Sequence, residues 1–247
     1  MRQINQRGIA IGPILYIVAI LAVLVSAIAA GSGSFNSDTS AVKAKAQATA
    51  FLEYADEVKF AVDRVLGKGF TDTHVSFEET SGLSKRPNGT IIDHTNPNCT
   101  QSDCKVFNPE GGGVIPRLMP AGAVVDPSTV PSVANSWHPQ SFKITTRRIL
   151  NVGTDTGAGG TELVLLVGRP KNSVCMKIND MLGIPNPGGK PPIDSWDCGS
   201  SAFTGVYSVC NDPIGNSVPA LAGKLAFCLS DDGTESNNGL VRVLISR

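Results

Sequence analysis

The sequence predicts an α+β fold: a long N-terminal apolar helix, then an amphipathic helix packed on a C-terminal antiparallel sheet. Three observations support this prediction. Residues 9–30 carry no charge, residues 41–66 repeat apolar side chains at helical spacing, and the second half of the chain contains short runs typical of strands. With 26 glycines, 16 prolines and six cysteines, the fold should also be loop-rich and stapled by disulfides.

The uncharged segment Ile9–Ala30 has the composition of a membrane-spanning helix. As a helix it would extend roughly 33 Å, which matches the hydrocarbon core of a bilayer. Arg2 and Arg7 precede it and the next basic residue is Lys43, so the rest of the chain should be translocated. Three interpretations remain open: an uncleaved anchor, a secretory signal cut near residues 27–29, and a short basic leader cut before the apolar stretch.

A second helix is predicted after a polar interruption. Residues 31–40 (GSGSFNSDTS) predict a flexible joint, because glycine costs about 1 kcal/mol relative to alanine inside a helix. Residues 41–66 predict an amphipathic helix that ends at Gly67 and Gly69, within a head spanning residues 41–247. Its apolar stripe consists of Phe51, Tyr54, Val58, Val62, Val65 and Leu66.

Loops and an antiparallel sheet are predicted for the remaining residues. Turn-forming residues are dense from His74 to Gln140, so we expect long loops with short strands there. A short helix over residues 173–182 should connect two hairpins. The strands of these hairpins are predicted at residues 142–152, 161–167, 224–229 and 240–246.

The charge balance argues against nucleic-acid binding. Lys+Arg and Asp+Glu each number 21, so the net charge is zero, whereas phosphate neutralisation requires a broad basic face. The common hydrolase, nucleotide and dinucleotide motifs are absent, and the three histidines form no metal motif. We therefore predict no enzymatic activity. Gly111–Gly113 lacks the Lys-Ser/Thr of a phosphate loop and is interpreted as a flexible turn.

One acidic loop, residues 230–239, is a candidate ion site. Asp231, Asp232, Glu235 and Asn237 place several hard oxygen ligands, which calcium prefers, within a short segment. The spacing does not match an EF-hand, and acidic Asn/Gly-rich hairpin turns are common without an ion. Calcium is thus the one cofactor that the sequence suggests.

The N-terminus resembles the leader of type IV pilins and type II secretion pseudopilins. Met1–Gly8 (MRQINQRG) precedes the uncharged segment, and in that family a membrane peptidase cuts after the glycine. The resemblance implies cleavage between Gly8 and Ile9. The family usually has glutamate at the fifth residue after the cut, where this chain has Pro13, which argues for a minor or divergent subunit. The likeness covers residues 1–66 well and the remainder only by architecture.

The resemblance also implies partners and a location. The subunit would sit in the bacterial inner membrane with a periplasmic head, meet a prepilin peptidase, and then join identical or related pilin subunits in a surface or periplasmic filament. Small residues such as Ala19, Ala22 and Ala27 would allow close helix approach. The alternative hypothesis is a membrane-anchored or secreted, disulfide-stapled module of the cell envelope that binds a ligand.

The cysteines are expected to form disulfides rather than a zinc site, because no CxxC pair occurs. Six cysteines allow fifteen pairings, which sequence alone leaves open. Cys99–Cys104 is the favoured pair because its loop is short and lies between turn residues. Pilin-like proteins often close a C-terminal loop with a disulfide, and by this likeness we predict Cys175–Cys198 and Cys210–Cys228.

Overall fold

The computed structural model describes the backbone of residues 11–130, 136–154, 160–195 and 201–247, with side chains from Thr39 onward in these ranges. The chain divides into two compact units, and the boundary falls between Lys43 and Ala44. Both units contain part of the helix α1 (Ile11–Gly67). The second unit, Ala44–Arg247, contains every strand that the structure describes and is called the head below.

The prediction of a separate, long apolar N-terminal helix is wrong. α1 is one helix of 57 residues, so residues 31–40 lie inside it rather than forming a joint between two helices. Each glycine there disfavours the helix by only about 1 kcal/mol, and a helix that continues on both sides propagates through such positions. Among the residues whose side chains the structure describes, no helix is both long and apolar enough to cross a membrane.

The α+β class and the four-stranded antiparallel sheet are confirmed. The strands are β1 (Phe142–Arg147), β2 (Glu162–Val167), β3 (Ala226–Ser230) and β4 (Asn238–Ile245). They lie in the order β1-β2-β4-β3, and every neighbouring pair is antiparallel. The two predicted hairpins therefore join through β2 and β4. The helix α2 (Asn172–Leu182) lies between the hairpins in sequence, as predicted, and Gly183 ends it in a left-handed conformation.

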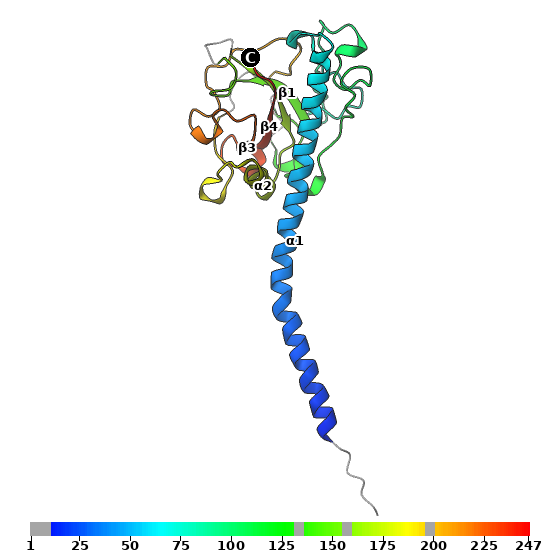
Figure 1. Ribbon diagram of the computed structural model, residues 1–247, viewed down its shortest axis with the longest axis vertical. Coiled ribbons are helices and arrows are strands. Elements are labelled where there is room, and N and C mark those ends of the chain that lie inside the picture. The colour runs from blue at the N-terminus through cyan, green and yellow to red at the C-terminus, as the bar shows by residue number, and fades with distance from the viewer. Residues whose placement is uncertain (1–10, 131–135, 155–159, 196–200) are drawn as a thin grey trace, which may run out of the picture. The chain divides into compact units, whose positions relative to one another are not determined.

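Alternating residues of the strands send side chains to two apolar layers. Leu163, Leu165 and Val167 of β2 face the layer formed with α1 and α2. Val164 and Leu166 face a second layer, which loop residues cover. Figure 1 shows the cyan part of α1 running along the sheet, with α2 near β3. The α1 residues in the first layer are Ala48, Phe51, Tyr54, Ala55, Val58, Ala61, Val62 and Val65.

The segment between Phe70 and Ser141 is largely irregular, as its turn residues predicted. In its described part it contains short 3-10 turns and isolated bridges instead of the short strands that were expected. One bridge pairs Ser76 with Lys105, and another pairs Lys85 with Ile91. Two disulfides whose cysteines are both described staple the head. The loops therefore depend on side-chain and covalent contacts for their positions.

Candidate functional site

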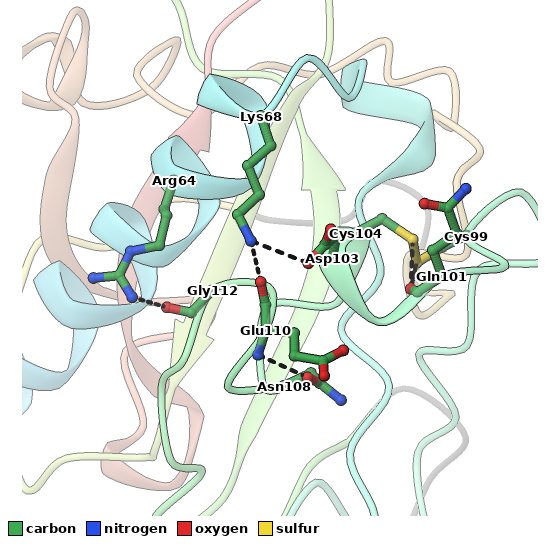
Figure 2. A network of polar contacts seen from close by, with 9 residues as sticks. All are labelled: Arg64, Lys68, Cys99, Gln101, Asp103, Cys104, Asn108, Glu110 and Gly112. Carbon is green, nitrogen blue, oxygen red and sulfur yellow. Dashed lines mark hydrogen bonds and ion pairs between the residues drawn. A yellow bond between two sulfur atoms is a disulfide. The ribbon is translucent and has the colours of Figure 1, made fainter.

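Several loops meet the C-terminal end of α1. The helix closes with hydrogen bonds from Lys68 N to Val65 O (3.1 Å) and from Gly69 N to Leu66 O (2.9 Å), and Gly69 has a φ of 94°. Figure 2 shows two loops facing this end, one closed by the Cys99–Cys104 disulfide and the other containing the glycine turn. The helix end is therefore held from outside by residues far away in sequence.

Two basic side chains of the helix end make these contacts. Arg64 Nη1 donates a hydrogen bond to the carbonyl oxygen of Gly112 (3.0 Å). Lys68 Nζ lies 3.2 Å from Asp103 Oδ1 and also donates to the carbonyl oxygen of Glu110. Cations at a helix C-terminus also interact favourably with the helix dipole. We call these five residues the α1 clamp (Figure 2).

The glycine turn Gly111–Gly113, interpreted from the sequence as a flexible turn, is closely packed at Gly111 and Gly112. A Cβ atom at Gly112 would lie 2.8 Å from Cβ of Ala61 on α1 and would collide with the backbone of Val106. A Cβ atom at Gly111 would collide with the backbone of Lys105. These glycines are needed for close approach of the turn to the helix. The sequence cannot distinguish this role from conformational freedom.

The disulfides agree with the sequence prediction in one case and differ in another. Cys99–Cys104 is present, as predicted. Cys228 pairs with Cys175, so the predicted Cys175–Cys198 and Cys210–Cys228 pairs are wrong. Cys210 is disulfide-bonded, and Cys198 lies outside the described residues. The Cys175–Cys228 pair follows from packing, because α2 docks on β3 and brings the two Cα atoms to 5.4 Å.

The two bonds differ in how they act on the head. Cys175–Cys228 joins the core, where both cysteines have an exposed fraction of 0% and Asn179 hydrogen-bonds the backbone of Cys228 at 2.8 and 2.9 Å. Cys99 is 8% exposed. Sequence separations of 53 and 5 residues correspond to loop-closure contributions of about 4 and about 2 kcal/mol. Cys99–Cys104 thus fixes a local loop, whereas Cys175–Cys228 secures the fold.

The carboxylates of the acidic loop accept hydrogen bonds from neighbouring residues and do not form a metal site within the described residues. Asp232 accepts hydrogen bonds from the backbone and hydroxyl of Thr234 and from Asn237. Glu235 accepts one from the backbone of Asn172. Asp231, Asp232 and Glu235 are not brought together as ligands, because within the described residues no group of three or more His, Cys, Asp or Glu side chains is placed to hold a metal.

The cation beside this loop is Arg169. Its guanidinium stacks 4.2 Å from the centre of the Trp137 ring and donates hydrogen bonds to Ser236 O and to Asn237 Oδ1. Burial lowers the pKa of Arg169 to about 10, while Asp231 and Asp232 raise it. The guanidinium remains charged at neutral pH and offsets part of the negative charge of the loop. A buried arginine therefore supplies a positive charge beside this loop.

One histidine makes a contact that sequence reasoning missed. His94 Nε2 lies 3.0 Å from Ser84 Oγ, and that hydroxyl donates its proton to the carbonyl oxygen of Phe142 (2.9 Å). Both side chains are buried, and burial lowers the pKa of His94 to about 3. A serine whose proton is already donated to a backbone carbonyl is not activated by the imidazole. The pair is structural, and no sequence spacing marks it.

The described grooves also lack an assembled set of catalytic groups. One groove of 160 Å³ lies beside Glu78, Glu79 and Lys105. Glu78 is paired with Lys105 at 2.8 Å, and Glu79 accepts hydrogen bonds from Ser81 and Ser84. A second groove of 230 Å³ between α1 and β4 is mainly apolar. Its lining is Lys59, Asp63, Leu66, Leu225, Val243, Leu244, Ile245 and Ser246.

The structure does not test the residues predicted for leader cleavage and membrane assembly. Gly8 and Ile9 lie outside the described residues. Pro13, Ala19, Ala22 and Ala27 fall within α1, in the part whose side chains are not described. Their roles stay predictions.

Comparisons with protein-family models, with curated proteins and with solved structures found no match for this chain.

Proposed function

We propose that the chain is a structural subunit, a pilin or pseudopilin of minor or divergent type, in a type IV pilus-like or type II secretion-like filament. The observation that carries this proposal is the N-terminal sequence, in which the basic leader-like Met1–Gly8 precedes an uncharged apolar segment. The uncharged N-terminal sequence and the stripe that packs in the head core belong to the same helix.

The proposed mechanism is an exchange of contacts rather than a chemical reaction. Residues 9–30 would be held in the inner membrane and would later pack against the same segment of identical or related subunits. Small side chains allow close approach of packed helices, which van der Waals contacts then stabilise. In the head, the apolar stripe and the α1 clamp hold the other end of the helix. The only enzyme the proposal requires is a prepilin peptidase acting on the leader.

The first test is the N-terminal residue and mass of the mature protein purified from its native membrane. A chain that begins at Ile9 supports the proposal. A start near Ala30 identifies a secreted domain, and an intact Met1 identifies an anchored module; either result contradicts prepilin processing. Gly8→Val should abolish cleavage, whereas Gly12→Ala, four residues later, should leave it unchanged. Processing that is unaffected by Gly8→Val also overturns the proposal.

A further inference from the structure

We propose that the Cys99–Cys104 disulfide is a redox-sensitive lock on the C-terminal end of α1. When the bond is closed, its loop holds the α1 clamp in place. When a dithiol reductant opens the bond, the last turn of α1 and the clamp loops loosen while the head stays folded. This inference concerns the head alone and does not depend on filament assembly.

A continuous set of backbone contacts connects the disulfide to the helix. The Cys104 carbonyl accepts a hydrogen bond from Ser76 N (3.0 Å), just after the segment that leaves α1. Lys105 follows Cys104 in the chain. Its N–H donates to Ser102 O (3.1 Å), and its carbonyl oxygen accepts from Gly112 N (3.0 Å). Gly112 in turn binds Arg64. The position of the closed loop therefore determines the position of the glycine turn against the helix.

The side chain of Asp103 connects the disulfide loop directly to the end of α1. Asp103 lies inside the disulfide loop, next to Cys104, and its carboxylate is the partner of Lys68. Lys68 is the first residue after α1. An exposed ion pair contributes little unless its groups are held in place, because ordering two long side chains costs entropy. The Cys99–Cys104 bond restricts the positions that Asp103 can take, so opening the bond should weaken the ion pair between Asp103 and Lys68.

The two described disulfides differ in accessibility, which makes selective reduction possible. Cys99 has an exposed fraction of 8%, whereas Cys175 and Cys228 are fully buried. Thiol–disulfide exchange requires a thiolate to reach a sulfur atom, so accessible bonds are the labile ones. The Gln101 carbonyl oxygen lies near both sulfur atoms, 3.0 Å from Cys104 Sγ and 3.5 Å from Cys99 Sγ. Cys104 is only 1% exposed, so Cys99 is the more accessible of the two. Figure 2 shows both cysteines at the edge of the clamp.

The reaction is an ordinary two-electron exchange. A thiolate of the dithiol attacks Cys99 Sγ, the Cys99–Cys104 bond breaks, and Cys104 leaves as a thiolate that takes a proton from water. The second thiol of the reductant gives up its proton and attacks the mixed disulfide, which releases Cys99 as a thiolate. The dithiol is oxidised to a disulfide, and the cystine is reduced to two cysteines.

The test combines thiol mapping with hydrogen exchange on the full chain. The protein is treated with dithiothreitol under native conditions, alkylated, and mapped by mass spectrometry, and amide exchange is followed in parallel. We expect Cys99 and Cys104 to be alkylated before Cys175 and Cys228. Exchange should become about tenfold faster in segments 65–76 and 102–113, while β2 changes less than about twofold, as local opening requires.

Two variants separate the lock from general loosening. The double variant C99S/C104S should reproduce the fast exchange without reductant. Lys68→Met should accelerate exchange at the helix end alone, with the disulfide intact. The proposal is overturned if Cys99–Cys104 resists reduction in the folded protein, if Cys175–Cys228 opens first, or if the bond opens with no faster exchange near Lys68. The reduction experiment decides the matter even if the double variant does not fold.

Discussion

Lys68 Nζ lies 3.2 Å from Asp103 Oδ1, which joins the residue after α1 to a loop 35 residues later in the chain. The same ammonium group also donates to the carbonyl of Glu110. One side chain thus holds both the disulfide loop and the glycine turn against the helix. The α1 clamp is consequently sensitive to changes in either loop.

Gly112→Ala should destabilise the head by about 1–3 kcal/mol, because the new methyl group would meet Ala61 on α1 and the backbone of Val106. Gly67→Ala is the matched control: a Cβ atom there meets nothing within 4 Å, and alanine favours a helix. Urea denaturation of both variants measures the free energy of unfolding. A Gly112→Ala protein as stable as the Gly67→Ala control would mean that the turn is not closely packed.

Arg169→Met should lower stability by about 2–3 kcal/mol, because it removes a buried guanidinium that stacks on Trp137 and donates to two half-buried oxygens, Ser236 O and Asn237 Oδ1. Arg117→Met is the control, since Arg117 pairs with Glu57 at the surface and stacks on Tyr54. That exposed pair contributes about 1 kcal/mol or less. The two free energies of unfolding should therefore differ clearly. Equal losses would indicate that Arg169 is not the internal counter-charge of the loop.

Millimolar calcium should leave the melting temperature of the head unchanged. Asp232 is already engaged by Thr234 and Asn237, and Arg169 lies beside the loop, so a divalent cation would have to displace existing contacts. Thermal scans with calcium and with a chelator measure this. If calcium raised the melting temperature in a saturable way, and Asp232→Asn removed that rise, calcium would bind at this loop and the prediction would be wrong.

The sequence predicted the elements whose stability comes from local pattern. β2 and β4 lie where their β-branched and aliphatic residues predicted strands, and both are almost wholly buried. α2 lies where a short helix was expected to connect the two hairpins. The stripe on α1 from Phe51 to Val65 faces the sheet, as expected.

The remaining features depend on contacts between distant segments. The partner of Cys228 is decided by where α2 docks, and composition does not contain that information. Arg169 places a positive charge beside a loop more than 60 residues away, and the sequence of the loop alone does not reveal this contact. The break predicted at residues 31–40 relied on the local cost of glycine, which a long helix outweighs. Sequence patterns therefore located the sheet and missed the groups that organise the loops.

Stability should fall as the pH drops from 6.5 to about 4.5. Burial lowers the pKa of His94 to about 3, so in this range the unfolded chain takes up a proton that the folded head does not. The free energy of unfolding should decrease by about 1.4 kcal/mol per pH unit. His94→Gln should flatten this slope, whereas His74→Gln, at an exposed position, should not. An unchanged slope in His94→Gln would exclude His94 as the source.

Lys143 also makes the free energy of unfolding depend on pH, but mainly above pH 7, outside the range used to test His94. Burial lowers the pKa of Lys143 to about 7, helped by the nearby Arg147, Arg86 and Arg169. Between pH 7 and about 10.5 the unfolded chain binds a proton that the folded head releases, so this group makes stability rise with pH there. Below pH 7 it is protonated in both states. Burial also lowers the pKa of His138, which adds to the slope below pH 6.5, so the difference in slope between the wild type and His94→Gln is what reports His94.

Non-reducing peptide mapping should find Cys99 joined to Cys104 and Cys175 joined to Cys228. Cys210 should also be found in a disulfide-linked peptide. Breaking the Cys175–Cys228 bond with the double variant C175A/C228A should cost about 4 kcal/mol, twice the loss expected for C99S/C104S, because it closes the longer loop. A linked Cys175–Cys198 peptide would contradict the docking of α2 on β3, since that geometry places Cys228 beside Cys175.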